Sequence, residues 1–280
     1  MMKKKIMLFM IPAMALTLAS CAQKEQAQEA ANGFRTGILS FMVSASGDQT
    51  MTEHIMKEHH SDFQGNGDRE LYNNISSALL ALDSGEIQFF GTNKATADYI
   101  AAGNEKLRVL SPADAVMQTE FSMLTMEENT ETYEILNSAI AALKENGTLE
   151  QLITSYIEAP DGNFDAETVI PAFEGADTIR IAVTGDIPPL DYTTADGKAT
   201  GFNVALLAAI AEYAGVNIEP VTMESISRST ALASGKVDAI FWFCATICKD
   251  HPEVRIRETI EGTKATEPYI VLDAAMVAKQ

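Results

Sequence analysis

The sequence is poor in cysteine, and it has no long apolar segment beyond its first twenty residues. Its three cysteines, Cys21, Cys244 and Cys248, are too few to build a disulfide scaffold. No later segment has the length and uniform hydrophobicity of a membrane-spanning helix. We therefore expect the folded part of the chain to be held together by a hydrophobic core.

Cys244 and Cys248 stand four residues apart, a spacing that would place both thiols on one face of a helix. No second Cys or His pair follows nearby, so core or loop thiols are favoured over metal ligands. A local disulfide between the two is the remaining alternative.

Positive charge is also scarce. The chain has 20 Lys and Arg residues against 39 Asp and Glu residues, which gives a net charge of −19. Loss of residues 1–20 would remove three lysines and no acids, and the net charge would become −22. Such a chain repels nucleic acid, so we expect no nucleic-acid partner. A solvated acidic surface accounts for this charge without a cationic ligand.

The first twenty residues have the pattern of an export signal. Lys3–Lys5 is basic, and Ile6–Leu18 is apolar but too short for a permanent membrane helix. The run ends in Leu18-Ala19-Ser20-Cys21, which resembles the cleavage site of bacterial lipoproteins. That resemblance implies lipidation of Cys21 and an extracytoplasmic, membrane-anchored place in the cell envelope. An ordinary secretory signal followed by a chance cysteine is the alternative.

The rest of the chain divides into two blocks. Residues 21–33 are rich in Gln, Glu and Ala and predict a tether. Pro, Gly and acidic residues are frequent in residues 159–177, which predicts a linker. Residues 34–158 and 178–280 remain as structured blocks.

The second block predicts alternating strands and helices. Its expected elements are a strand over 178–183, a loop through Pro188-Pro189, a helix over 203–214, a strand over 218–223, a helix over 225–234 and a strand over 237–243. This βαβαβ order favours a parallel sheet with helices on its faces.

The first block has a weaker pattern. Its expected elements are strands over 36–42, 87–90 and 121–126, and helices over 51–60, 75–82, 96–102, 132–145 and from Thr148 onward. Gln151 stands three residues after Thr148, which predicts a capping box.

One segment of the first block is echoed in the second. Ala81–Gln88 and Ala231–Asp238 share the pattern of a helix end, a glycine and a buried strand. The echo indicates either a tandem duplication or two lobes of similar topology within one protein.

Residues 179–243 resemble the opening part of bacterial extracellular solute-binding proteins of family 3, the polar amino-acid type. The resemblance lies in the Pro-Pro loop, Asp196-Gly197, Thr200-Gly201-Phe202-Asn203 and Leu232–Asp238. Thr266-Glu267-Pro268-Tyr269 resembles the family's approach to its hinge, and residues 269–279 its first hinge-crossing strand. The resemblance implies a type II periplasmic-binding-protein-like fold, in which two α/β lobes are joined by a two-strand hinge.

The order of the parts differs from that of the family. Residues 75–100 resemble the end of its second lobe, and residues 121–157 resemble its return hinge and closing helices. We therefore predict a circularly permuted member, with residues 159–177 joining the family's termini and Gln280 lying near Arg35. Two separate binding domains are disfavoured, because each block of about 120 residues lacks half of the two-lobe set.

The resemblance implies a monomeric, extracytoplasmic lipoprotein of an ABC importer that captures a small polar solute between its lobes. It implies permease subunits as partners, and no cofactor or catalysis. From lobe one, Asp186, Arg228 and Trp242 are the expected solute ligands. From lobe two, Ser40, Phe41 and Asn93 are the expected solute ligands. A loop-capping Asp186, a surface Arg228 and a core Trp242 are the structural alternatives.

The chain also departs from the family. Members usually carry a Thr and an Arg after the third strand of lobe one, where this chain has Phe241–Thr246, and an Asp where it has Asn93. The clamp for an amino acid is thus incomplete, and a modified amino acid, a peptide-like solute or an aromatic solute is equally consistent. Two other functions stay open: a dehydratase-like enzyme with Asp186 as proton donor, and a sensing lipoprotein without transport. His54, His59 and His60 lack the spacing of a helical zinc motif, so we predict no metal site.

Overall fold

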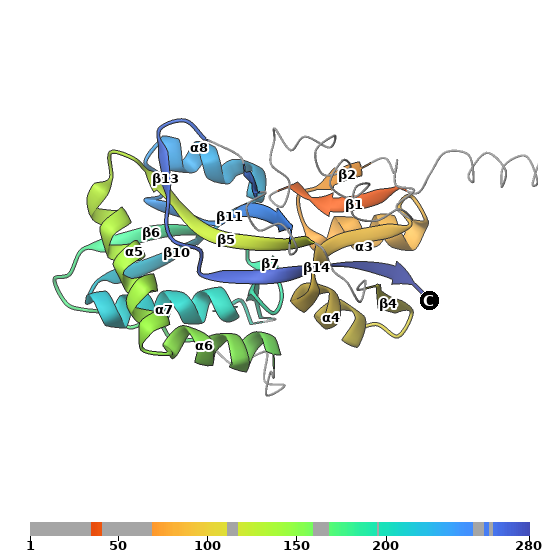
Figure 1. Ribbon diagram of the computed structural model, residues 1–280, viewed down its shortest axis with the longest axis horizontal. Coiled ribbons are helices and arrows are strands. Elements are labelled where there is room, and N and C mark those ends of the chain that lie inside the picture. The colour runs from red at the N-terminus through yellow and green to blue at the C-terminus, as the bar shows by residue number, and fades with distance from the viewer. Residues whose placement is uncertain are drawn as a thin grey trace, which may run out of the picture.

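The computed structural model describes residues 35–40, 69–110, 117–158, 168–194, 196–248, 255–257 and 260–280. These residues form two α/β lobes that lie side by side along the long axis of the molecule (Figure 1). Lobe one is the larger, on the left of the view, and lobe two lies on the right. Phe41, Cys21, the helix predicted over 51–60, the signal peptide and the tether fall outside the described residues.

Lobe two is built mainly from the first part of the chain. Its elements are β1 (Thr36–Leu39), β2 (Arg69–Tyr72), α3 (Ile75–Ser84), β3 (Phe89–Asn93), α4 (Lys94–Ala102) and β4 (Leu107–Leu110). β1 pairs in parallel with both β2 and β3.

Lobe one is built mainly from the second part. Its helices are α5 (Thr130–Glu145), α6 (Thr148–Ile153), the π-helical turn η2 (Thr154–Glu158), α7 (Phe202–Ala214), the 3-10 turn η3 (Ser225–Ser227) and α8 (Arg228–Ala233). Its strands are β6 (Thr178–Val183), β7 (Asp186–Ile187), β8 (Asp191–Thr193), β9 (Ala199–Thr200), β10 (Asn217–Thr222), β11 (Ala239–Cys248), β12 (Arg255–Arg257) and β13 (Thr263–Ala265). β6 pairs in parallel with β10 and β11, so the predicted parallel βαβαβ order is confirmed.

Two long strands connect the lobes, β5 (Met117–Met126) and β14 (Ile270–Lys279). β14 pairs with β5 of lobe one over Ile270–Asp273, and from Ala274 onward with β3 of lobe two. The strand order β10-β6-β11-β5-β14-β3-β1-β2 therefore continues from one lobe into the other. This arrangement confirms the predicted two-lobed α/β architecture.

The echo in the sequence corresponds to a repeated structure. Gly85 ends α3 with φ +82, and Gly235 follows α8 with φ +68. Ala81 and Ala231 accept hydrogen bonds from the backbone amides five residues further on, at 2.9 Å in both lobes. Because glycine alone adopts such a positive φ without steric cost, both copies use it to turn from helix to strand.

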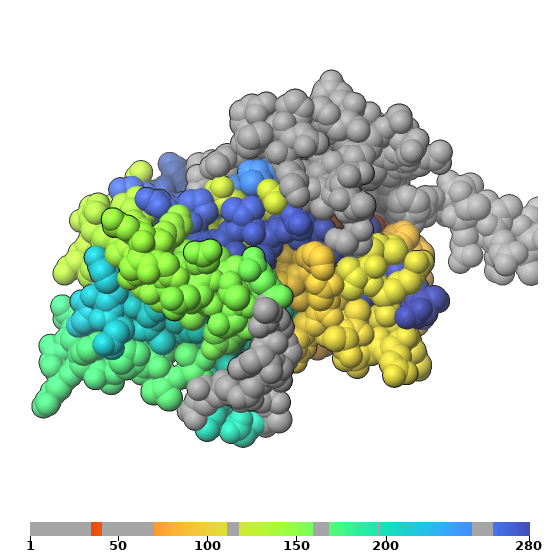
Figure 2. Space-filling model, turned by 60° about the horizontal axis from the view of Figure 1, so that its bottom comes forward, coloured from red at the N-terminus to blue at the C-terminus, as the bar shows by residue number. Residues whose placement is uncertain are grey.

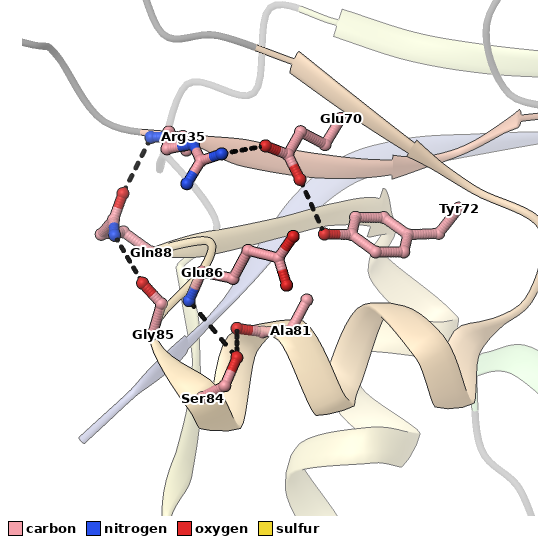
Figure 3. A network of polar contacts seen from close by, with 8 residues as sticks. All are labelled: Arg35, Glu70, Tyr72, Ala81, Ser84, Gly85, Glu86 and Gln88. Carbon is pink, nitrogen blue, oxygen red and sulfur yellow. Dashed lines mark hydrogen bonds and ion pairs between the residues drawn. The ribbon is translucent and has the colours of Figure 1, made fainter.

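The repeat extends to the strand that starts each lobe. The Arg35 carbonyl accepts from the Gln88 amide at 3.0 Å, while the Arg35 amide donates to Gln88 Oε1 at 2.8 Å. Arg180 and Asp238 make the same backbone and side-chain pairs, both at 2.8 Å. In lobe two this contact continues into a polar network in which Glu70 joins Arg35 to Tyr72 (Figure 3). Each lobe therefore contains one copy of this helix, glycine and strand unit.

One hydrophobic core cluster spans both lobes. It joins Phe90 and Leu82 of lobe two to Leu136, Leu206 and Phe241 of lobe one, all at most 1% exposed. A second, smaller cluster lies beneath α8. In the space-filling view the green surface of lobe one directly adjoins the orange and yellow surface of lobe two (Figure 2).

Local details differ from the sequence predictions. The predicted capping box at Thr148 is wrong, because Gly147, with φ +79, caps α6 without a side-chain hydrogen bond. Cys244 and Cys248 lie on strand β11 and not on a helix. The helix predicted over 225–234 divides into η3 and α8.

Candidate functional site

The polar side chains nearest to the lobe boundary in lobe one centre on a buried carboxylate, Asp191. Its side chain is 1% exposed. It accepts hydrogen bonds from the Gly185 amide at 2.6 Å, from the Thr184 amide at 3.1 Å and from Trp242 Nε1 at 3.0 Å. Burial raises the pKa of Asp191, and these three hydrogen bonds oppose that rise by favouring the ionised form. Asp191 thus connects the loop after β6, at Thr184 and Gly185, to Trp242 in β11.

Arg228, the first residue of α8, supplies a positive charge that opposes the negative charge of Asp191. It is 4% exposed, and its guanidinium donates to the Phe241 carbonyl at 2.5 Å and to the Ser225 carbonyl at 3.4 Å. Burial lowers the pKa of Arg228 to about 10, while the charge of Asp191 opposes that fall, so the side chain stays protonated at neutral pH. Its guanidinium is directed at two backbone carbonyls.

Trp242 occupies a strained position in β11. It has φ +66, and the pairing of β11 with β5 shifts register between Ile240 and Phe243. A bulge of this kind redirects a side chain, and a non-glycine residue at positive φ persists only where its surroundings hold it. Here the indole packs edge-on against Phe121, with ring centroids 5.1 Å apart, and it is 2% exposed.

Asp186 lies in β7, where the loop after β6 approaches lobe two. Burial and the charge of Asp191 raise the pKa of Asp186 to about 6. A hydrogen bond from the Ile75 amide and the charge of Arg228 oppose that rise. Ile75 is the first residue of α3, so the N-terminus of a lobe-two helix is one of the groups that act on the pKa of Asp186.

Two further contacts cross between the lobes. Ser40, which directly follows β1 in lobe two, lies with its hydroxyl oxygen 2.7 Å from that of Ser225 in lobe one. The rings of Tyr99 on α4 and Tyr192 on β8 lie with centroids 6.1 Å apart. These two contacts bring side chains of the two lobes together at the boundary.

Asn93 ends β3 and caps α4. Its Oδ1 accepts from the Thr96 amide at 2.9 Å, and its Nδ2 has no partner although the residue is 1% exposed. Because its oxygen is engaged by the cap, the group that Asn93 can still offer to another molecule is a donor.

The structure brings Asp186, Arg228 and Trp242 together around Asp191, and it brings Ser40 to the lobe boundary. Asp191 and Ser225 were not among the residues predicted from sequence. Asp191 lies between buried Leu190 and buried Tyr192, a pattern that marks a buried acid, but its partner Trp242 is 51 residues away. No local signal could have paired them.

Within the described residues, no three His, Cys, Asp or Glu side chains gather as they would around a metal ion. His54, His59 and His60 lie outside those residues. No described helix is long and apolar enough to cross a membrane.

Comparison with known families bears on lobe one directly. Residues 179–247 match the bacterial extracellular solute-binding proteins, family 3. The matched segment runs from β6 into β11 and includes Asp186, Asp191, Arg228 and Trp242. The predicted family resemblance is therefore confirmed for this segment, and the family is one of binding proteins. A search of curated protein sequences gave no match.

Solved structures similar to this chain are distant from it. The ligand-binding component of an ABC-type import system from Staphylococcus aureus, with zinc bound, is 11% identical over 88% of this chain and 65% of its own, with a TM-score of 0.41. The GluR0 ligand-binding core with L-glutamate is 10% identical over 89% of this chain and 85% of its own, with a TM-score of 0.39. CbnR, a LysR family transcriptional regulator, is 8% identical over 95% of this chain and 71% of its own, with a TM-score of 0.42.

These likenesses carry no argument about fold or ligand, because every TM-score lies below 0.5. The chain spans slightly less than two thirds of the length of the Staphylococcus protein.

Proposed function

We propose that this protein is the extracytoplasmic substrate-binding lipoprotein of an ABC importer, and that it captures a small polar solute between its two lobes. The observation that carries the proposal is the family match over residues 179–247, which includes the buried charge cluster at the lobe boundary. The two lobes and the continuous strand β14 supply the hinged frame that such capture requires.

The solute site is proposed at this boundary, with Asp186 and Trp242 from lobe one and Ser40, Phe41 and Asn93 from lobe two. Asp186 would accept hydrogen bonds from a solute ammonium or hydroxyl, and Asn93 Nδ2 would donate to a solute oxygen. Arg228 is a weaker candidate for a carboxylate fork, because two of its N–H groups already donate to backbone carbonyls. A polar solute without a free α-carboxylate suits this set better than a standard amino acid.

A thermal-shift screen of amino acids, modified amino acids, peptides and aromatic solutes tests the proposal. A cognate solute at a hundredfold excess over its Kd should stabilise the protein by about 2.7 kcal/mol. If no member of such a library moves the transition, solute capture is the wrong function.

We also propose that the chain is a circular permutant of the family. Thr36 at the start of β1 pairs with Phe89, and Val277 near the end of β14 pairs with Phe90 on the same strand. Residues 35 and 280 therefore lie toward the same end of the lobe-two sheet, as the permutation requires. A rearranged chain in which a short linker joins residue 280 to residue 34, and which starts at 178 and ends at 158, should fold and bind the same solute with similar Kd. Failure of this rearranged chain to fold would count against the permutation.

Membrane attachment through Cys21 is part of the proposal and has its own test. Mass spectrometry of the mature N-terminus should find a lipidated cysteine, and Cys21→Ala should release the protein from membranes. An unmodified N-terminus at another residue would indicate an ordinary secretory signal.

Catalysis is the second candidate function, and the observation that favours it is the raised pKa of Asp186. A carboxyl with a pKa of about 6 can donate a proton near neutral pH, as a dehydratase would need. Loss of turnover in Asp186→Asn with solute binding retained would establish an enzyme. Absence of turnover of any bound solute in the wild-type protein would leave capture alone.

A further inference from the structure

Two of the contacts between the lobes occupy similar positions in the two copies of the repeat. Ile75 lies six residues before Ala81, and Ser225 lies six residues before Ala231. These two residues therefore begin the equivalent helical segments, α3 in lobe two and η3 in lobe one.

Their partners also correspond. Ser40 lies five residues after Arg35, and Asp186 lies six residues after Arg180, so each follows the first strand of its lobe. The hydroxyl oxygens of Ser40 in lobe two and Ser225 in lobe one lie 2.7 Å apart, and the Ile75 amide of lobe two is the backbone group that lowers the pKa of Asp186 in lobe one. In each case a residue that follows a strand of one lobe acts on the first residue of a helical segment in the other lobe.

We propose that these two contacts form a reciprocal latch that closes the lobes on each other through the protein's own groups. The latch rests on the proposed hinged capture for its use, but the contacts join protein to protein. They favour the closed form before a solute has made any contact.

Chemistry distinguishes the two halves of the latch. The Asp186 half joins a carboxylate to a helix N-terminus, where backbone N–H groups and the helix dipole both favour negative charge. The Ser40–Ser225 half joins two neutral hydroxyls, one of which donates to the other. Asp191, Arg228 and the Ile75 amide are the charged or polar groups that act on Asp186.

A latch of this kind sets the fraction of protein molecules that are in the closed form, which is the form competent to hold a solute. The apparent affinity of a two-state binder falls in proportion to the fraction of molecules in the competent form. Weakening the latch should therefore increase the rate of solute release and weaken the apparent affinity, even where the solute touches neither serine.

Hydrogen–deuterium exchange of the solute-free mature protein tests the latch without a solute. Asp186→Ala should speed exchange of amides at the start of α3 at least threefold, and Ser225→Ala should do so at the end of β1. Asp177→Ala and Ser227→Ala, which alter exposed residues of lobe one, are the matched controls and should leave both regions unchanged.

A double-mutant cycle adds a test that a general loss of stability would not pass. Ser40→Ala combined with Ser225→Ala should change exchange no more than either single variant, because each removes the same contact. Unchanged exchange in Asp186→Ala and Ser225→Ala, or equal changes in the controls, would overturn the latch.

The latch and the proposed function can fail separately. If the exchange results agree with the latch but no solute shifts the melting transition, capture is wrong and the latch stands. If a solute binds but the variants exchange like the wild type, capture stands and the latch is wrong.

Discussion

At the scale of single residues, the buried and opposite charges of Asp191 and Arg228 are the centre of lobe one's charge cluster. Asp191 is 1% exposed, so its charge depends on three hydrogen bonds and on the nearby guanidinium. Removing one partner of a buried pair leaves the other charge uncompensated, which is costlier than removing both.

We therefore expect Arg228→Met to lower the free energy of unfolding by about 3–5 kcal/mol, measured by urea denaturation. The double variant Asp191→Asn/Arg228→Met should lose less than the sum of the two single variants. Arg180→Met, which removes a half-exposed pair with Asp238, is the matched control and should lose much less. Equal losses in Arg228→Met and Arg180→Met would show that the buried position does not matter.

Asp186 makes the free energy of unfolding depend on pH, and the direction of this dependence follows from its raised pKa. Its pKa is about 6 in the folded protein, above the ordinary value of 3.8, so between these values the folded state binds more protons than the unfolded state. Its contribution to stability therefore rises as the pH falls from 7 towards 4. At pH 7, Asp186→Asn should be more stable than wild type by about 1–2 kcal/mol, and the gain should vanish near pH 4. Urea denaturation across this pH range checks it, and a gain that is constant with pH would show that ionisation of Asp186 is not its cause.

Trp242 combines two roles that substitutions can separate. Trp242→Phe keeps an aromatic ring beside Phe121 but removes the N–H that donates to Asp191, and we expect a loss of about 1–3 kcal/mol of stability. If Trp242 also contacts the solute, Trp242→Ala should weaken binding at least about tenfold, or about 1.4 kcal/mol, while Trp242→Phe weakens it less. Calorimetry measures both affinities. Unchanged Kd in both variants would remove Trp242 from the solute site.

At the scale of elements, the turn into α7 depends on a close backbone approach. A Cβ on Gly201 would lie 2.7 Å from the Leu190 carbonyl oxygen, and Gly201 has φ +105. Gly201→Ala should therefore cost at least about 2 kcal/mol of stability, from steric overlap and backbone strain. Gly197→Ala, where φ is +85 but no atom lies within 4 Å, is the control and should cost about 1 kcal/mol. Equal losses in thermal or urea denaturation would mean that strain alone governs both positions.

Sequence predicted most of these elements in lobe one and fewer of their contacts. The strand over 178–183 and the helix ended by Gly215 followed from alternation, apolar composition and a glycine stop, which are local properties. The bulge at Trp242, its bond to Asp191 and the cap at Gly147 did not follow. The first two depend on partners far along the chain, and the third depends on a backbone angle that the identity of Thr148 does not reveal.

At the scale of the whole molecule, the two lobes share more than a boundary. β14 belongs to the sheets of both lobes, and one core cluster extends through both. Loss of either lobe would expose apolar surface of the other, so we expect the lobes to unfold together.

Urea unfolding followed by two probes tests this expectation. The fluorescence of Trp242, the chain's one tryptophan, reports lobe one, whereas far-ultraviolet circular dichroism reports helices of both lobes. The two transitions should coincide within error. Separate midpoints would mean that the lobes are independent folding units.

β14 changes its pairing strand from β5 to β3 at one point, and a rotation of one lobe relative to the other must twist β14 there. At Asp273 the strand still bonds β5, with Gln118 donating to the Asp273 side chain at 2.8 Å, and at the next residue it bonds β3. Torsion at this one peptide of β14, together with a bend in the second connecting strand β5, would leave both of these ladders intact. The two lobes would then rotate about an axis through that point, and the residues farthest from the axis would move the largest distance.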